Sequence, residues 1–392
     1  MISARYFSLL GGSAAAVLIA AGGPALASTA SASRIPGRGA VSSILQPGDV
    51  TTGVRGVAHG NVVLTGSAVI GAGPATAPFL YQGSLRSAAG AAVSTLTPPF
   101  SGETTATFYG PDTHRFNPGS IPSGQVRAVG SYQSSAAPAG VRNEGMIYLG
   151  PVSGPGGTWT SINVPADGTD TTGGARACPR ARAGCLVMDT IAHSTMGNLV
   201  VGNYDLNPAV PGGLVSGNGF IYNLTSHQWT LLDLGGSQSS ASSIYGIWQD
   251  GGAGSATYTL AGGSSASRFQ QGFLMNYNER TGHFGTPKYY SEGNVPSLAT
   301  HFEGITAVPG GFHLVALSSA QPVSMASIPA SARFGVFGNA RWIPVNVAAS
   351  PLCSGGCQLT TGNTVYRNQV MGLYVPKSTG GVHSYLADVP AG

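Results

Sequence analysis

The feature that most constrains this chain is a unit that recurs along it. Triplets that begin with a polar or bulky residue, continue with Gly or Thr, and usually end with a β-branched residue lie at 55–57, 109–111, 189–191, 245–247, 303–305 and 363–365. Their middle residues are 54, 80, 56, 58 and 60 positions apart. A repeat of this length is typical of architectures in which similar units stack, because one unit alone cannot bury its apolar face.

Three further segments complete each unit. The second carries apolar residues and usually Gly, as in Asn198–Gly202 and Tyr258–Gly262. The third is rich in aromatic residues, and we place it at 78–81, 145–148, 219–222, 272–275, 333–336 and 382–385. The fourth lies at 93–97, 159–164, 229–234, 284–289 and 342–347. Short β-branched and aromatic runs between Gly- and Pro-containing turns indicate strands, so each unit is predicted to have four.

These units predict an all-β chain, folded as a six-bladed β-propeller with one four-stranded antiparallel sheet in each blade. The sixth unit lacks a fourth strand, and the N-terminal run VSSILQP at 41–47 resembles VSTLTPP at 93–99. We therefore predict that an N-terminal strand closes the last blade, which leaves no open sheet edge between the terminal blades. Seven blades are the alternative, because the spacing of 80 residues has room for one more sheet.

The N-terminus has the order of a secretory signal peptide. Arg5 precedes an apolar, small-residue stretch from Ser8 to Ala21, and Ala25–Ala27 forms an A-x-A cleavage triplet. Gly and Pro residues interrupt the stretch, which favours a cleaved signal over a membrane anchor. We predict a signal peptide at 1–27, a linker at 28–40 and the propeller at 41–392, in a secreted or periplasmic protein with no membrane span after cleavage.

The composition favours a folded, turn-rich β protein. Only 8% of the residues are charged, whereas the chain holds 60 Gly, 15 Tyr and 13 Phe. Disordered chains usually show the opposite balance, with many charges and few aromatic residues. A formal net charge of +4 spread over 392 residues is too weak for the concentrated basic face that nucleic-acid binding requires.

The four cysteines fall into two local pairs, Cys178 with Cys185 and Cys353 with Cys357. An exported chain meets an oxidising compartment, so we predict that each pair forms a disulfide. A four-cysteine zinc site is less favoured, because only the second pair has the usual C-x2-4-C spacing. We expect no cofactor.

Parts of the chain resemble a known kind of repeat. The runs GNLVVGNYD, GNGFIYN and WTLLDLGG, and again YGIWQDGG, YTLAGG and QGFLMNYNERTGHF, are similar to the bacterial extracellular repeats called HAF repeats. The resemblance covers about two of the six units, and Gly-Phe stands where those repeats have His-Ala-Phe. It implies an exported β-propeller and supplies no catalytic residues.

A ring of side chains is predicted at the mouth of the central channel, because the triplets begin the innermost strands. Its members are Arg55, Tyr109, Asp189, Tyr245, Glu303 and Asn363. We predict that this ring binds or acts on an extracellular glycan or other cell-surface ligand. Asp189 and Glu303 are the candidate catalytic carboxylates, because acid–base cleavage of a glycosidic bond uses such a pair. Arg55, Tyr109, Tyr245 and Asn363 are the candidate substrate-binding residues, with Arg55 suited to an acidic group.

Several alternatives stay open. In one alternative, the ring residues only connect the blades through hydrogen bonds, and the chain is a non-catalytic module that binds a protein or a cell wall. An enzyme would be a polysaccharide hydrolase, or a lyase with a Tyr or His base. Four histidines lie near the first strands, but isolated histidines on loops are usually ordinary polar residues, so we expect no metal. We expect a monomer.

Overall fold

The computed structural model describes residues 40–71, 75–154, 156–178, 184–207, 217–234, 242–266, 270–331 and 335–390. The predicted signal peptide at 1–27 and the linker up to residue 39 lie outside the described residues. Within the described ranges the chain is built from strands, and its helical segments are 3-10 turns of three residues each. The predicted all-β class is therefore confirmed. None of the helical segments described is long and apolar enough to cross a membrane.

Residues 50–162 form two antiparallel four-stranded sheets, each in the order of the sequence. The first sheet consists of β2 (Val50–Gly56), β3 (Val62–Val69), β4 (Thr76–Gly83) and β5 (Ser94–Thr95). The second consists of β6 (Glu103–Thr113), β7 (Gln125–Ser134), β8 (Glu144–Pro151) and β9 (Thr158–Ile162).

The next two groups of strands share one nine-stranded sheet, in which a single parallel pair, Asn218 with Ser242, joins them. One group is β10 (Leu186–Met196), β11 (Leu199–Asn207), β12 (Asn218–Asn223) and β13 (Trp229–Leu231). The other is β14 (Ser242–Gln249), β15 (Thr257–Ser264), β16 (Gln271–Asn278), β17 (His283–Phe284) and β18 (Lys288–Tyr290). Within each group every pairing is antiparallel.

The last part of the chain forms a five-stranded and a four-stranded sheet. The former holds β19 (Thr300–Val308), β20 (Gly311–Ser318), β21 (Ser324–Ser331), β22 (Val336–Phe337) and β23 (Arg341–Pro344). The latter has the order β1 (Val41–Ile44), β26 (His383–Asp388), β25 (Gln369–Pro376) and β24 (Cys357–Tyr366). β1 lies antiparallel to β26, so the first and last described strands are neighbours.

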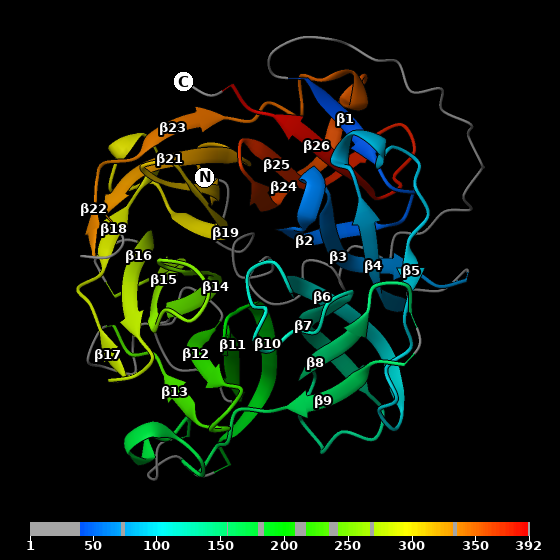
Figure 1. Cartoon of the computed structure of the whole chain (residues 1–392). Helices are drawn as coiled ribbons and strands as arrows, with labels where there is room; N and C mark the ends of the chain where they lie inside the picture. Colours follow the sequence, from blue (N-terminus) through cyan, green and yellow to red (C-terminus); the bar gives the residue numbers. More distant parts are fainter. Residues whose placement is uncertain are drawn as a thin grey trace.

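The sheets are arranged around a common centre, as Figure 1 shows, which is a propeller-like architecture. The strands β2, β6, β10, β14, β19 and β24 lie innermost; each contacts the next, and β24 contacts β2. Apolar side chains fill the space between neighbouring sheets. Val63 and Leu80 of the first sheet, for example, pack with Phe108 and Ala128 of the second. Each sheet thus buries its faces against its neighbours, as expected of a repeat architecture.

Each innermost strand contains a β-bulge at an equivalent place. The bulge leaves one residue without a partner on the second strand, and these residues are Thr52, Tyr109, His193, Tyr245, Glu303 and Asn363. A bulge re-aims the side chain of its extra residue, which explains why a polar or bulky residue recurs there. Four of the sequence triplets begin at these residues. The other two triplets begin away from the bulge. Arg55 lies three residues after the bulge residue of β2, and Asp189 lies four residues before the bulge residue of β10.

The bulge also explains the Gly of the second segment. A Cβ on Gly130 would lie 1.9 Å from the carbonyl oxygen of Thr107, two residues before the bulge residue Tyr109. The same clash recurs at 1.8–2.0 Å at Gly66, Gly202, Gly262 and Gly372. Only Gly lets a second strand approach the bulged backbone this closely.

The strand predictions are confirmed except in parts of two units. The third strand of the fifth unit was placed at 333–336, but β21 runs through Ser324–Ser331, where the only large apolar residues are Met325 and Ile328. Phe334 of the predicted segment lies outside the described residues. The predicted strand at 284–289 is divided into β17 and β18, which both pair with β16.

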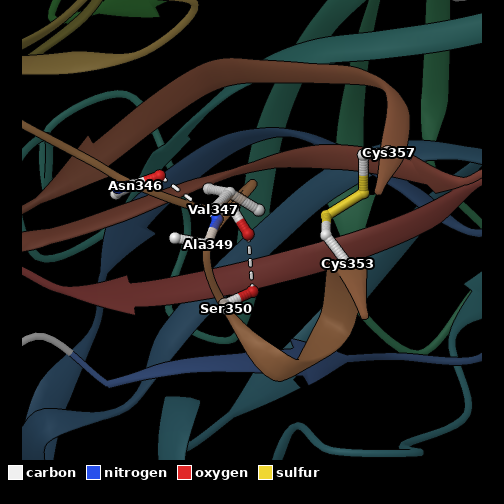
Figure 2. Close-up of a disulfide and its surroundings, with 6 residues drawn as sticks. All are labelled: Asn346, Val347, Ala349, Ser350, Cys353 and Cys357. Atoms are coloured by element: carbon white, nitrogen blue, oxygen red, sulfur yellow. Dashed lines mark hydrogen bonds between the residues drawn. A yellow bond between two sulfur atoms is a disulfide. The ribbon is translucent and has the colours of Figure 1, made fainter. Parts of the chain in front are cut away.

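Both predicted disulfides are present, Cys178–Cys185 and Cys353–Cys357. Figure 2 shows that the second joins the 3-10 turn η7 (Pro351–Cys353) to the first residue of β24. In the loop before this turn, the Ser350 hydroxyl donates a hydrogen bond to the Val347 carbonyl (2.6 Å). The disulfide therefore fixes the position of the chain at the start of the innermost strand β24.

We predict that Gly130→Ala destabilises the protein by about 1–3 kcal/mol or more, because its methyl group would overlap a backbone oxygen that cannot move alone. Gly119→Ala, in the loop of the same β-hairpin, is the control: no atom lies within 4 Å of its Cβ position. We expect it to change stability by no more than about 0.5 kcal/mol. Thermal and urea unfolding measure both variants, and equal stabilities would refute the close-approach argument.

Candidate functional site

A cavity of about 100 Å³ lies among the innermost strands. Its lining includes all the bulge residues together with Arg55. Each innermost strand therefore contributes one bulge side chain, because the bulge turns it out of the sheet pairing. The volume has room for several water molecules, each of which needs at least about 10–15 Å³. Of the predicted site residues, the structure brings Arg55, Tyr109, Tyr245, Glu303 and Asn363 together around this cavity.

One side of the cavity is aromatic. The rings of Tyr109 and His193 have centroids 4.9 Å apart, and those of His193 and Tyr245 lie 4.5 Å apart and almost perpendicular. The ring of His301 follows, 5.8 Å from that of Tyr245. Edge-to-face and tilted ring pairs of this kind are attractive and rigid. They hold the rings of four neighbouring strands, β6, β10, β14 and β19, in fixed positions.

Tyr109, His193 and Tyr245 are electrically neutral near pH 7. Burial lowers the pKa of His193 to about 4, although the negative charge of Glu303 acts in the opposite direction. His193 Nε2 lies 2.8 Å from Asn203 Oδ1, so we assign the proton to Nε2, which leaves Nδ1 as an acceptor. Burial also raises the pKa of Tyr109 and of Tyr245, which keeps both hydroxyls protonated. This wall can therefore donate and accept hydrogen bonds without carrying charge.

Glu303 is the one carboxylate that lines the cavity among the residues described. Its Oε1 lies 2.7 Å from Nε2 of His301, two residues earlier on β19. The side chain of Glu303 is 18% exposed and that of His301 only 6%. The other ring nitrogen of His301, Nδ1, is buried and has no hydrogen-bond partner in the described part of the chain. The histidine thus orients the carboxylate, which remains accessible from the cavity.

Asn363 and Thr52 hold neighbouring sheets together. The Asn363 side-chain amide donates to the Thr51 carbonyl of β2 (2.8 Å), and its oxygen accepts from Thr361 (2.8 Å). The Thr52 hydroxyl contacts the carbonyl oxygens of Thr65 and Phe108. On this side of the cavity the bulge residues therefore connect neighbouring sheets through hydrogen bonds.

Arg55 lines the cavity from a point beyond the bulge on β2. It is only 5% exposed, and its Nε donates to the Pro111 carbonyl (3.2 Å). The rings of Trp248 and Phe116 lie 5.2 and 5.9 Å from the guanidinium carbon. Burial lowers the pKa of Arg55, while the charge of Asp112 acts in the opposite direction.

Asp189 does not line this cavity. It is 1% exposed and forms an ion pair with Arg142, and its Oδ1 accepts a hydrogen bond from Asn143 (2.5 Å). Asp205 lies opposite it on β11. Burial and the charge of Asp189 raise the pKa of Asp205 to about 7. Asp189 therefore belongs to a contact between the second sheet and β10.

Sequence reasoning missed two bulge residues, Thr52 and His193. The signal that would have found them is the Gly of the second strand. Gly66 is paired with Thr51, and Gly202 with Ala192, so each of these glycines lies opposite the residue just before the bulge.

A second, more open hollow lies between β14 and the β19–β20 hairpin, lined in part by Trp248, Asp250 and Phe312. Asp250 is 5% exposed and accepts hydrogen bonds from Thr259 Oγ1 (2.9 Å) and Asn276 Nδ2 (3.1 Å). Burial outweighs these bonds and raises the pKa of Asp250 to about 7. The protonated acid is therefore the form that the fold favours.

Comparisons with known proteins define the fold and no family. No family model and no curated protein matches this chain, so the resemblance to HAF repeats stays a prediction. Among solved structures, the α-L-arabinanase of Penicillium chrysogenum complexed with arabinobiose is 10% identical, with 87% of this chain and 93% of that chain covered and a TM-score of 0.50.

Two further solved structures are similar at lower TM-scores. The α-L-arabinofuranosidase of Fusarium graminearum complexed with arabinobiose is 10% identical, with coverages of 88% and 96% and a TM-score of 0.48. A luciferin-regenerating enzyme is 10% identical, with coverages of 90% and 98% and a TM-score of 0.47. At such low identity the likeness to the arabinanase supports the propeller-like fold alone.

We predict that the contribution of Asp250 to the stability of the protein falls as pH rises from about 4 to 7. The pKa of Asp250 is about 7 in the folded protein and 3.8 when unperturbed, so the folded state holds more protons than the unfolded state in this interval. The Asp250 contribution is on the order of 4 kcal/mol at most. Asp250→Asn, which keeps the shape of the protonated acid, should flatten the pH profile of urea unfolding. A profile as steep as that of the original protein would contradict this.

Proposed function

We propose that this protein binds an extracellular glycan at its central cavity. The observation that carries the proposal is that bulges on neighbouring inner strands direct Tyr109, His193 and Tyr245 into one wall, with Glu303 beside it. Sugars present apolar C–H faces and hydroxyl groups. A wall of fixed rings and neutral hydrogen-bonding groups matches both features, and binding sites typically combine the two. The arabinanase that shares the fold was solved with a bound sugar, arabinobiose, which supports the same choice of ligand class.

The arrangement of the carboxylates favours binding over hydrolysis. Hydrolysis of a glycosidic bond usually requires two of them, one on each side of the bond. Glu303 alone lines the cavity within the described ranges, and Asp189 is engaged by Arg142 and Asn143. The enzyme version of the proposal keeps Glu303, oriented by His301, as one catalytic group and Asp189 as the other. It requires Arg142, whose side chain is 54% exposed, to swing away and release Asp189.

We further propose that the sheets form six blades of one ring, with β1 as the closing strand of the last. The continuous series of contacts between inner strands and the pairing of β1 with β26 support this reading. Between β9 and β10, the residues that the structure describes form a 3-10 turn and an isolated bridge from Thr171 to Trp229, which is less than a seventh sheet. Two disulfides support export, because disulfides persist in oxidising compartments.

Two truncations test the closing strand. A chain that begins at Ala40 should fold, whereas one that begins at Pro47 loses β1, exposes the edge of β26 and leaves the places of Ile44 and Leu45 empty. Each of these buried side chains contributes about 1.5–3 kcal/mol, so we expect a lower melting temperature and aggregation of the shorter chain. Equal melting temperatures would remove the closing role from β1.

The glycan proposal is tested with the mature protein and a panel of plant and bacterial polysaccharides, following both binding and product formation. We expect His193→Ala and Tyr109→Ala to weaken binding at least tenfold, because each removes part of the aromatic wall. Asp388→Asn, an exposed substitution on β26, is the control and should bind as the original protein does.

Glu303→Gln and Asp189→Asn separate the two versions of the proposal. Turnover that both substitutions abolish would establish the enzyme version, whereas binding without turnover would establish the binding module. If the polysaccharides bind equally well to the His193 and Tyr109 variants, the central cavity is not the site.

A further inference from the structure

The guanidinium of Arg55 is buried at the cavity with most of its hydrogen-bond donors unused. Its only hydrogen bond to the described residues is from Nε to the Pro111 carbonyl. The terminal nitrogens make none, yet they are not among the side-chain atoms that are sealed from solvent without a partner. Arg55 is one of the residues that line the cavity. Trp248 and Phe116 flank the group and fix its position through their rings.

The charges around Arg55 do not balance. The carboxylate whose charge acts on Arg55 is that of Asp112. Asp112 is fully buried and accepts hydrogen bonds from the backbone amides of Thr113 (2.8 Å) and Gly197 (3.0 Å). Asp112 also attracts a second buried arginine, Arg127, which donates to the Gly197 carbonyl (2.8 Å). Two guanidinium groups therefore share one carboxylate. A buried positive charge without a full counter-charge is costly, unless a bound anion compensates it.

No other group that lines the cavity supplies that counter-charge to Arg55. Glu303, which also lines the cavity, is hydrogen-bonded through Oε1 to Nε2 of His301 (2.7 Å), and the charge that acts on Arg55 is that of Asp112. His193 is neutral, and Tyr109 and Tyr245 keep their protons. The cavity is thus positive at the Arg55 end, and its aromatic wall is uncharged. Arginine in a fixed orientation favours a carboxylate, which it binds through two parallel N–H···O bonds.

We propose that the ligand of this cavity is an acidic glycan, and that Arg55 binds the carboxylate of a uronic acid residue. This inference rests on the glycan-binding function proposed above and adds the substrate class. The aromatic wall would contact the sugar ring, while the guanidinium would select the charge. A neutral sugar would leave the Arg55 donors without an acceptor, which lowers its affinity.

The test compares three probes by calorimetry on the full mature protein: an oligogalacturonate, its fully methyl-esterified form, and acetate. The ester keeps the size of the oligosaccharide and removes its charge. We expect the acid to bind at least tenfold more tightly than the ester, and to lose affinity as ionic strength rises. Acetate alone should bind far more weakly, because it lacks the sugar ring.

Arg55→Lys keeps the positive charge but loses the two-pronged geometry, so it should reduce the preference for the acid over the ester. Arg115→Gln is the matched control: Arg115 also lies against Phe116, but it is exposed and does not line the cavity. Its preference should equal that of the original protein. If Arg55→Lys does not fold, the acid and ester probes on the original protein still decide.

Each outcome separates the two proposals. Equal affinity for the acid and the ester would overturn the acidic-ligand inference and leave glycan binding standing. Acetate that binds as tightly as the oligogalacturonate would also overturn the inference, because the site would then be one for small anions. If no neutral or acidic glycan binds, both proposals fail.

Discussion

The structure depends on one close contact, repeated around the centre of the molecule. In five of the inner strands, the carbonyl oxygen two residues before the bulge residue lies where the Cβ of the facing residue would be, at 1.8–2.0 Å. Glycine at 66, 130, 202, 262 and 372 makes this approach possible. In the sheet that contains β19, Ala316 takes the equivalent place. The bulge at Glu303 thus forms opposite Ala, so the glycine contact accompanies the bulge in five sheets, and the bulge itself determines which side chain is turned toward the cavity.

Where the residue after a bulge is Gly, at 53, 110, 246 and 304, the neighbouring sheet approaches closely. A Cβ on Gly53 would lie 2.1 Å from the Tyr109 carbonyl, and one on Gly110 would lie 2.6 Å from the His193 carbonyl. The backbone of one bulge thus packs directly on the bulge of the next sheet. Two sets of glycines therefore act at the centre. Those at 66, 130, 202, 262 and 372 lie opposite the bulges, and those at 53 and 110 allow a short distance between sheets.

This dependence explains what the sequence could and could not reveal. Strand positions and the repeated unit follow from alternation and Gly spacing, and the disulfides follow from local Cys pairs. The position of a bulge depends on how two strands pair, so the sequence of one strand alone does not show where the bulge lies. Arg55-Gly56 and Asp189-Thr190 look like the triplet, but Gly66 and Gly202 place the bulges at Thr52 and His193. The counter-charges of Arg55 and Asp189 likewise come from other sheets, where a single segment gives no sign of them.

The bulge side chains around the centre differ in what they bond to, although the fold repeats. The contact between the first and last sheets accounts for part of this difference. Asn363 donates to the Thr51 carbonyl, and the Thr51 amide donates to the Ser384 hydroxyl (2.8 Å each). These bonds join residues more than 300 positions apart, where no hairpin connection holds the strands together. Polar bulge side chains are engaged there in joining the sheets. The polar groups of the other bulge residues bond within their own sheets instead. His193 bonds to Asn203 (2.8 Å) and Glu303 to His301 (2.7 Å). The hydroxyls of Tyr109 and Tyr245 bond to Ser131 and Ser243.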